Sequence, residues 1–279
     1  MSTALGRQVG SQMNVTSKRF FPGSIDYDSS ISANYSEGRA LSQEAAATWR
    51  TAVEPFIPRK PRLTILDLGA GTGRFAPVLA ALSGARFIGI DLSLNMLRVA
   101  VRQRLVDTIG YVAGSAEAIP LRYGSCDVAW LSHVFHHVRE RAACASELRR
   151  VVRSEGRVLV RGTFADRLDG FPTLFRFFPG ARRICQDLPT IGETSAVFRG
   201  EKFTLEAHRR IQQRTCGSLR EFAARASKRA DTSLALLSDD EFDSGLAALQ
   251  EAAAQESAVS PVVETVDLLV FQRHHSRAA

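Results

Sequence analysis

The sequence has few cysteines, few lysines and no long apolar run. None of its apolar stretches approaches the roughly 18 residues of a membrane-spanning helix, and the N-terminus lacks the charged-then-apolar pattern of a signal peptide. The cysteines lie far apart, with no C-x-x-C pair and no histidine at metal-ligand spacing, so we expect free buried thiols. These absences predict a cytoplasmic protein that has neither a membrane span nor a metal site. The cysteines are Cys126, Cys144, Cys185 and Cys216.

Basic charge is plentiful but comes almost entirely from arginine. The net charge is +7 and the pI is about 9.7, yet the chain has only four lysines. The arginines are scattered along the chain and do not form blocks. We therefore attribute their excess mainly to the codon bias of a GC-rich genome; a basic face that binds RNA is the alternative. The 279 residues are 45% hydrophobic with 16 Phe, so they suffice for one large α/β domain with an appendage or for two small domains. No internal repeat is apparent.

Residues 63–75 organise the rest of the chain. An apolar, β-branched run carries Asp67 near its end, opens into Gly69-x-Gly71-x-Gly73, and is followed by apolar residues at helical spacing. This pattern predicts a strand, a glycine turn and a helix whose first amides face a ligand. The third glycine comes one position too early for the dinucleotide pattern G-x-G-x-x-G. A turn that binds no ligand is the alternative.

The series Asp67-x-Gly69-x-Gly71-x-Gly73 resembles motif I of the class I S-adenosylmethionine (SAM) methyltransferases. The resemblance covers residues 25–165 well and the final strand moderately. It implies an α/β, Rossmann-like, seven-stranded sheet with helices on both faces, closest to the small-molecule branch of quinone and natural-product biosynthesis. It also implies SAM as cofactor, S-adenosylhomocysteine (SAH) as product, and cofactor contacts at Asp67, Gly69, Ala70, Gly71 and Gly73.

Asp91 is the strongest single candidate for cofactor binding. It ends a second predicted strand, residues 86–91, and lies 18 residues beyond Gly73. Ligands of open α/β sheets bind at this carboxyl edge, where a carboxylate can accept hydrogen bonds from both ribose hydroxyls. The alternative for Asp91 is a helix cap, a role that could fall to Ser93 instead. Leu92 and Met96 are further predicted contacts.

Two other segments are expected to close around the cofactor. After a third strand at residues 108–113, the family places the adenine edge at Ser115, Ala116 and Glu117. An Asp is common where Ser115 stands, so the adenine contact would depend on the Ala116 backbone or on Glu117. Before motif I, Tyr35 and Arg39 resemble the aromatic and basic residues that cover the cofactor; the alternative is that they are surface and packing residues of a linker.

A histidine cluster follows the fourth predicted strand, residues 126–131. Ser132 is a predicted cofactor contact at the same sheet edge. His133, His136 and His137 have a spacing that could suit a metal, but no carboxylate or cysteine follows at ligand distance. One imidazole could instead face the acceptor and take a proton near neutral pH. A helix at residues 139–152 and a strand at 156–163 complete five parallel strands.

The strand and helix alternation breaks at residue 164. Helices are expected at residues 172–187, 218–228 and 239–254, with Ser218 and Asp239 as possible caps. Strands are expected at residues 208–215 and 261–272, and the resemblance implies that the last one is antiparallel beside the fifth. The predicted organisation is an N-terminal arm and cofactor-covering segment (1–40), a SAM-binding core (41–163), a helical cap for the acceptor that includes strand six (164–262), and a final strand and tail (263–279).

The predicted function is methyl transfer from SAM to a small-molecule acceptor. The density of Phe in the cap favours an apolar, aromatic or isoprenoid natural product and slightly favours C-methylation. O- or N-methylation of a small metabolite, RNA methylation and non-catalytic SAM binding are the alternatives. RNA is opposed because Ser132-His133 stands where an Asn/Asp-Pro-Pro-Tyr motif would be. Residues 1–20 are either disordered or an arm that orders against another subunit, which would make a homo-oligomer.

Overall fold

The computed structural model describes residues 25, 27–28, 31–82, 84–103 and 108–274. The predicted N-terminal arm, residues 1–20, and the oligomer that it would form lie outside these residues. Within the described part of the chain, no helix is long and apolar enough to cross a membrane. All four cysteines are buried and free, as expected.

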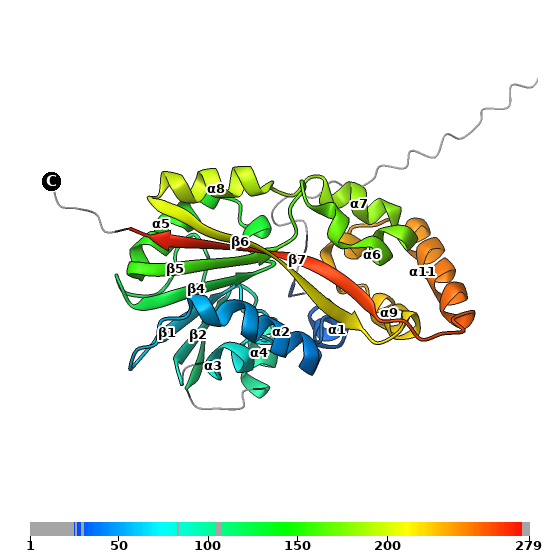
Figure 1. Ribbon diagram of the computed structural model, residues 1–279, viewed down its shortest axis with the longest axis horizontal. Coiled ribbons are helices and arrows are strands. Elements are labelled where there is room, and N and C mark those ends of the chain that lie inside the picture. Colours follow the sequence, from blue (N-terminus) through cyan, green and yellow to red (C-terminus); the bar gives the residue numbers. More distant parts are fainter. Residues whose placement is uncertain (1–24, 26, 29–30, 83, 104–107, 275–279) are drawn as a thin grey trace, which may run out of the picture.

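A seven-stranded sheet forms the centre of the fold (Figure 1). The strand order is β3-β2-β1-β4-β5-β7-β6, in which the first five strands pair in parallel and β7 alone runs in the opposite direction, between β5 and β6. This confirms the predicted fold and the position of the last strand beside the fifth. The strands are β1 (Thr64–Leu68), β2 (Arg86–Asp91), β3 (Ile109–Ala113), β4 (Cys126–Ser132), β5 (Val152–Gly162), β6 (Phe203–Cys216) and β7 (Val262–Arg273).

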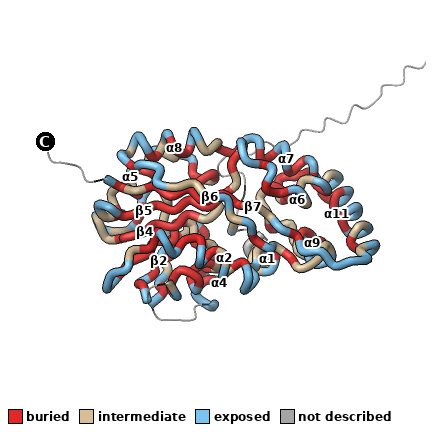
Figure 2. Tube along the Cα trace, in the orientation of Figure 1, coloured by how far each residue is buried: buried red, intermediate tan, exposed pale blue. Residues whose placement is uncertain are grey.

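Helices cover both faces of the sheet, and the central strands β1 and β4 are buried along almost their whole length (Figure 2). On one face α2 and α3 pack into a core built around Trp49, Phe75 and Trp130. On the other, α5 and α8 pack around Phe135 and Phe198. The helices of these layers are α2 (Gln43–Val53), α3 (Ala76–Ala80), α4 (Leu94–Arg102), α5 (Arg141–Val151) and α8 (Ile191–Gly200), with the short helices η1 (Glu54–Phe56) and η2 (Phe135–His137).

A second group of helices forms a cap at the end of the long β6–β7 hairpin (Figure 1). Helix α9 packs on α11, α10 packs on α7, and the N-terminal α1 contacts α9. The cap therefore lies beyond the carboxyl edge of the parallel strands and is joined to the sheet by two strands. Its helices are α6 (Pro172–Phe177), α7 (Pro179–Cys185), α9 (Leu219–Ala226), α10 (Thr232–Ala235) and α11 (Asp239–Ala254); α1 spans Ile31–Gly38 and η3 spans Leu168–Gly170.

The cap differs from prediction in three places. The single helix expected at residues 172–187 is two helices, because Phe178 leaves the helical region (φ −125°, ψ 72°) and Pro179 begins α7. Ser218 caps α9 as predicted, but Ser238 rather than Asp239 caps α11, in a capping box with Glu241. Helix α8, which belongs to the sheet layer and not to the cap, was not predicted.

Candidate functional site

The three glycines of the turn after β1 differ in the space around them. Gly71 has open space in front of it, whereas Gly69 and Gly73 are packed against other side chains. Gly71 has a φ of +56°, and a Cβ placed on it would have no neighbour nearer than a ring carbon of Tyr35 at 4.0 Å. A Cβ on Gly69 would instead meet the Val134 side chain at 2.3 Å, and one on Gly73 would meet the Tyr111 hydroxyl at 2.2 Å. Gly73 was predicted to contact the cofactor; its lack of a side chain serves the approach of Tyr111.

A cavity of about 960 Å³ opens beside this turn, at the carboxyl ends of the parallel strands. We call it the cofactor cavity. The structure brings together here most of the residues that the sequence predicted as cofactor contacts, from five separate segments. They are Tyr35, Gly69, Gly71, Asp91, Leu92, Met96, Ser115, Ala116, Glu117 and Ser132. Asp67 and Ala70 line a smaller adjoining cavity together with Arg74.

Asp91 ties the glycine turn to the next helix. Its Oδ2 accepts a hydrogen bond from the Gly71 amide at 2.7 Å, and its Oδ1 accepts one from the Ser93 amide at 2.8 Å. The Ser93 hydroxyl caps α4 by accepting from the Met96 amide, so the cap role falls to Ser93. Burial raises the pKa of the Asp91 carboxyl. Each carboxylate oxygen keeps a lone pair for a ligand in the cofactor cavity.

Asp67 is a buried carboxyl group near the end of β1, and Arg74 is the cation that shares its cavity without forming an ion pair with it. Its exposed fraction is 2%, and no described residue donates a hydrogen bond to its carboxyl oxygens. Burial, reinforced by the nearby negative charge of Asp91, raises the pKa of Asp67 to about 8. A cationic ligand group in the adjoining cavity would stabilise the ionised form.

The loop after β3 is held by its own hydrogen bonds. The Ser115 hydroxyl accepts from the Glu117 amide, and Oε1 of Glu117 accepts from the backbone amides of Arg139 and Glu140. Glu117 thus lines the cofactor cavity, and its carboxylate already holds the loop before α5 through these two hydrogen bonds. Leu92, another residue of the cavity wall, has 76% of its surface exposed.

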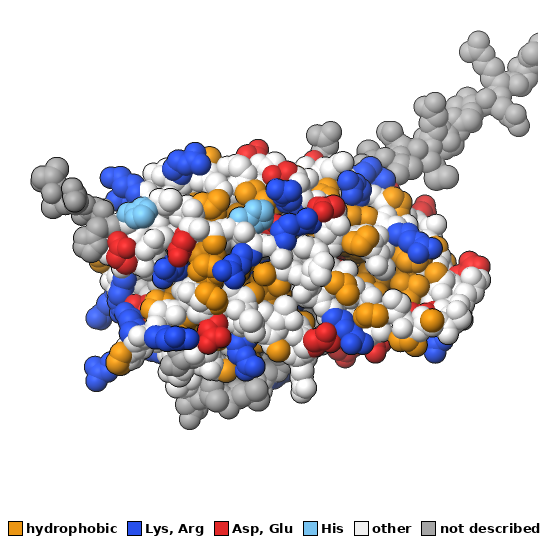
Figure 3. All heavy atoms as spheres, viewed as in Figure 1, with side chains coloured by type: hydrophobic (Ala, Val, Ile, Leu, Met, Phe, Trp, Pro, Cys, Tyr) orange, Lys and Arg blue, Asp and Glu red, His pale blue; other side chains and the backbone are white. Residues whose placement is uncertain are grey.

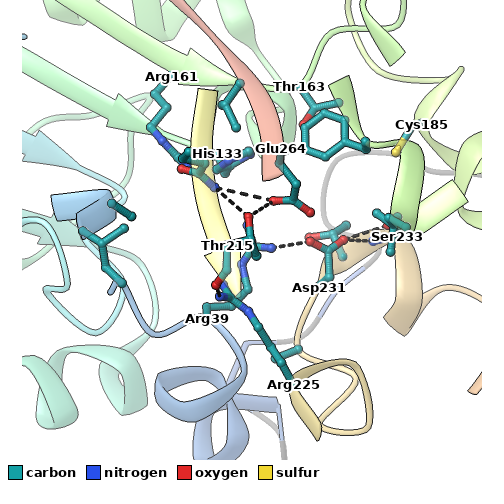
Figure 4. A pocket seen from close by; sticks show the side chains of 18 of the residues that line it. Arg39, His133, Arg161, Thr163, Cys185, Thr215, Arg225, Asp231, Ser233 and Glu264 are labelled. Atoms are coloured by element: carbon teal, nitrogen blue, oxygen red, sulfur yellow. Dashed lines mark hydrogen bonds and ion pairs between the residues drawn. The ribbon is translucent and has the colours of Figure 1, made fainter. Parts of the chain in front are cut away.

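A second cavity, of about 980 Å³, lies between the sheet edge and the cap (Figure 4). We call it the acceptor cavity. Tyr27, Tyr35 and His133 line both cavities, so the two meet at these side chains. Phe171 and Phe175 contribute part of its wall, but Phe177 and Phe178 lie in the packed core. The wall also carries five arginines and two acids: Arg39, Arg74, Arg161, Arg214, Arg225, Asp231 and Glu264.

Arg39 is placed differently from the prediction. It was expected to cover the cofactor, but its guanidinium forms an ion pair with Asp231 of the cap and lines the acceptor cavity. Tyr35 lies on the same helix turn and does reach the cofactor cavity. Arg39 therefore joins the N-terminal segment to the cap, because its partner precedes α10.

The three histidines after β4 have different surroundings. His133, with a φ of +53°, faces the junction of the two cavities, and His136 lines the acceptor cavity. His137 lines the cofactor cavity, where its Nε2 is 3.0 Å from the Tyr27 hydroxyl. Burial holds the pKa of His133 and His136 well below the ordinary value, and lowers that of His137 to about 4. All three imidazoles are therefore neutral in the free protein at pH 7, and the role of one of them as proton acceptor stays a prediction.

The comparisons with known proteins agree on the family. A family model described as a methyltransferase domain matches residues 66–160. A ubiquinone/menaquinone biosynthesis C-methyltransferase of Syntrophotalea carbinolica is 35% identical over 125 residues, which are 44% of this chain and 53% of that protein. A malonyl-[acyl-carrier protein] O-methyltransferase of Methylococcus capsulatus is 35% identical over 129 residues, 46% of either chain. The chain spans about half the length of these curated relatives.

Solved structures share the fold over a longer part of the chain. A protein named as a methyltransferase from an antibiotic biosynthesis pathway of Anabaena variabilis has a TM-score of 0.67 at 17% identity, with 84% of this chain and 99% of that chain covered. The [4+2]-cyclase SpnF has a TM-score of 0.59 at 19% identity, with 85% and 84% covered. Residues 66–160 therefore match a methyltransferase domain, and the fold is that of the class I SAM-dependent methyltransferases. SAM is the cofactor that this likeness indicates.

The cofactor cavity of this methyltransferase fits the chemistry of SAM. Asp67 is a carboxyl at the glycine turn that the charge of Arg74 only partly offsets, so a ligand ammonium would find a partner there. Asp91 offers carboxylate lone pairs at the sheet edge, and Leu92 and Met96 offer apolar surface beyond it. The open space in front of Gly71 admits a ligand close to the backbone.

Sequence reasoning missed the polar wall of the acceptor cavity. Arg161, Gln213, Asp231 and Glu264 are far apart in the chain and meet only because the β6–β7 hairpin and the cap fold over the sheet edge (Figure 4). One signal was present: Arg161 interrupts the apolar run of β5 close to its carboxyl end, and its guanidinium is buried there. A charged residue at that edge is an indication of a ligand site.

Proposed function

We propose that this methyltransferase transfers the methyl group of SAM to a small molecule bound in the acceptor cavity. The observation that carries the proposal is the junction of the two cavities at Tyr27, Tyr35 and His133. A methyl donor in one cavity and an acceptor in the other would meet at this point. The C-methyltransferase of ubiquinone/menaquinone biosynthesis among the relatives supports a small-molecule acceptor.

We assign the cofactor roles by the chemistry of each side chain. Asp91 accepts hydrogen bonds from the ribose hydroxyls, and Asp67 neutralises the ammonium of the methionine part. Leu92 and Met96 contact the adenine ring, and the backbone at Gly71 lies against the cofactor. When bound, SAM supplies an electrophilic methyl group on a sulfonium ion.

The chain's own contribution to the reaction is to position the acceptor and exclude water. Holding the reacting atoms in line can supply roughly 7 to 11 kcal/mol of the barrier. The cap closes the acceptor cavity above the sheet edge, and Phe171 and Phe175 form part of its apolar wall. His133 is neutral at pH 7 because burial and the charge of Arg161 disfavour its protonated form. Its unprotonated ring nitrogen can hydrogen-bond a hydroxyl or amine of the acceptor and take its proton as the methyl group is transferred, when that proton becomes strongly acidic.

The lining of the acceptor cavity is less apolar than the Phe-rich sequence of the cap suggested, because apolar side chains such as Leu174, Ile184 and Leu188 share it with charged ones. Phe177 and Phe178 pack within the cap, where Phe178 stacks on Phe242 of α11. Arginine, glutamine, threonine and carboxylate side chains form much of the wall instead. We therefore propose a polar acceptor. On the face shown in Figure 3, basic side chains are interspersed with acidic ones, and they form no continuous basic patch there.

Methyl transfer from labelled SAM tests the proposal. The purified protein is incubated with SAM carrying a labelled methyl group and, in parallel, with the small-molecule fraction and the RNA fraction of a bacterial extract. We expect label in the small-molecule fraction alone. Label in RNA, or no transfer by a protein that binds SAH, would contradict it. Transfer has to be measured, because a solved neighbour with the same fold is a cyclase.

His133→Gln is expected to lower kcat by about 10²- to 10⁴-fold for a hydroxyl or amine acceptor, because proton removal loses its base. The affinity for SAH should stay within about twofold, since no cofactor hydrogen bond is assigned to His133. His274→Gln, at an exposed position on the edge of the sheet, is the matched control. An unchanged kcat in His133→Gln would remove His133 from the proton transfer.

Asp67→Asn is expected to have opposite effects on stability and on cofactor binding. In the unfolded chain the pKa of Asp is about 3.9, whereas in the folded protein that of Asp67 is about 8. The folded state therefore holds the extra proton between these values, and its stability falls as the pH rises from about 4 to about 8. The substitution should remove this decline of stability. In the wild type the affinity for SAH should rise towards pH 8, because ionised Asp67 pairs with the ligand ammonium, and the substitution should remove this rise as well.

Urea unfolding and SAH titration at pH 5 to 8 check this prediction. The variant should be the more stable apo protein at pH 8 and should bind SAH about 10- to 100-fold more weakly, the worth of one charge-assisted hydrogen bond. Asp169→Asn, at an exposed ion pair with Arg210, is the control. A variant that is less stable than the wild type at pH 8 would show that the ionised Asp67 carboxyl does not destabilise the folded protein.

A further inference from the structure

Arg161 is a buried cation at the edge of the acceptor cavity. Only 2% of its surface is exposed. Its two terminal nitrogens donate to the Ser132 hydroxyl at 3.2 Å and to Oε1 of Gln213 at 2.9 Å, and its Nε has no partner. A guanidinium has five N–H donors, so these contacts leave hydrogen-bonding capacity for a ligand.

The surroundings of Arg161 fix the plane of its guanidinium. The group lies over the Trp49 ring at 4.5 Å and near the Phe75 ring at 5.2 Å. Gln213, which accepts from Arg161, also accepts from the Trp49 indole N–H at 2.7 Å. The guanidinium is thus held by two rings and an amide before any ligand arrives, which is the arrangement of a preorganised binding group.

The negative charges of the cavity wall do not neutralise Arg161. Among the described residues, no carboxylate lies within ion-pair distance of Arg161 or of Arg74. Asp231 is engaged by Arg39, and Glu264 accepts from the Thr215 hydroxyl at 2.8 Å. Burial lowers the pKa of Arg161 far below its ordinary value and that of Arg74 to about 10. Since arginine stays protonated in proteins, these shifts express the cost of one buried and one half-buried charge, neither of which is paired with a carboxylate.

The two arginines differ in what they can reach. Arg74 lines both the acceptor cavity and the small cavity beside Asp67 and the glycine turn, so the carboxylate of the cofactor's methionine part lies within its range. Arg161 lines the acceptor cavity and neither of the cavities at the glycine turn. An anion that pairs with Arg161 therefore belongs to the acceptor.

We propose that Arg161 binds an anionic group of the acceptor, a carboxylate or a phosphate, and so fixes the acceptor beside His133. This inference rests on the proposed function and names the class of its substrate. The two flat oxygens of a carboxylate, or two oxygens of a phosphate, match the planar fork of the guanidinium. The Arg161 carbonyl accepts from the His133 amide at 2.8 Å, so the anion site and the junction of the cavities are held together.

Matched pairs of ligands test this assignment on the full-length protein saturated with SAH. The pairs are indole-3-acetate with indole-3-acetamide, benzoate with benzamide, and phenyl phosphate with phenol, each titrated by calorimetry or ligand-observed NMR. We expect the ionised member of at least one pair to bind about tenfold or more tightly than the neutral one. The pair with the larger ratio distinguishes carboxylate from phosphate. Equal affinity within every pair would overturn the proposal.

Two substitutions at Arg161 and one nearby complete the test. Arg161→Gln should remove the preference for the ionised ligand and leave SAH affinity within about twofold, and Arg161→Lys should retain part of the preference. Arg157→Gln, on the same strand in an exposed ion pair with Glu206, should behave as the wild type. A full preference in Arg161→Gln would overturn the assignment, as would loss of SAH binding in a folded variant. Failure of the wild type to bind SAH would instead count against the proposed function.

Discussion

Gly71→Ala is expected to weaken SAH binding by at least about a hundredfold while costing only about 1 to 2 kcal/mol of stability. The new methyl group would point into the open space of the cofactor cavity, where a Cβ meets no protein atom closer than 4.0 Å. The stability cost is that of holding an L-residue in the left-handed region at a φ of +56°. The binding cost arises because the methyl group would occupy the space through which the ligand approaches the backbone.

Gly69→Ala is the matched comparison for this prediction. It also has a positive φ, but its Cβ would overlap the Val134 side chain at 2.3 Å, so overpacking adds about 1 to 3 kcal/mol. We therefore expect the larger loss of stability at Gly69 and the cleaner loss of binding at Gly71. Thermal unfolding and calorimetric titration with SAH measure the two effects. Wild-type SAH affinity in Gly71→Ala would show that the ligand does not approach this backbone.

Asp91→Ala is expected to weaken SAH binding by about 10²- to 10⁴-fold. Two hydrogen bonds from the ribose hydroxyls to a carboxylate are worth roughly 3 to 6 kcal/mol together. The same carboxylate holds the Gly71 and Ser93 amides, so its loss also frees the glycine turn. Ser93→Ala separates these effects, because it removes the cap of α4 and leaves the carboxylate in place.

Titration of both variants with SAH, alongside thermal unfolding, checks the assignment. Ser93→Ala should lose about 1 kcal/mol of stability and keep most of its SAH affinity. Asp91→Ala should lose its affinity even where its fold is retained. An equal loss of affinity in the two variants would mean that Asp91 acts through the start of α4 and not through the ribose.

The SAM-binding half could be predicted from the sequence because its signals are local. An apolar strand, a glycine turn and a carboxylate at the next strand end lie within residues 63–91, and parallel strands bring such ends to one edge. The same locality explains why Asp67, Gly71 and Asp91 meet in the structure as expected. At Gly73 the missing side chain makes room for Tyr111, and a glycine next to a ligand and a glycine next to a tyrosine ring look alike in a sequence.

The cap and the acceptor cavity could not be predicted in the same way. Pro179 divides a segment that reads as one helix, and the direction of each Phe depends on how the two pieces pack. Arg161, Gln213 and Asp231 come from a parallel strand, a hairpin and a short helix, and their proximity is set by tertiary packing alone. The composition of the cap therefore suggested an apolar acceptor, whereas the cavity itself presents arginines.

The measurement that tests the central claim most directly is calorimetric titration of the wild-type protein with SAH and, separately, with NAD⁺. The glycine turn, Asp67 and Asp91 predict one SAH bound per chain and no detectable binding of the dinucleotide. Absence of SAH binding together with binding of NAD⁺ would contradict the account, because the same cavity would then hold a different nucleotide.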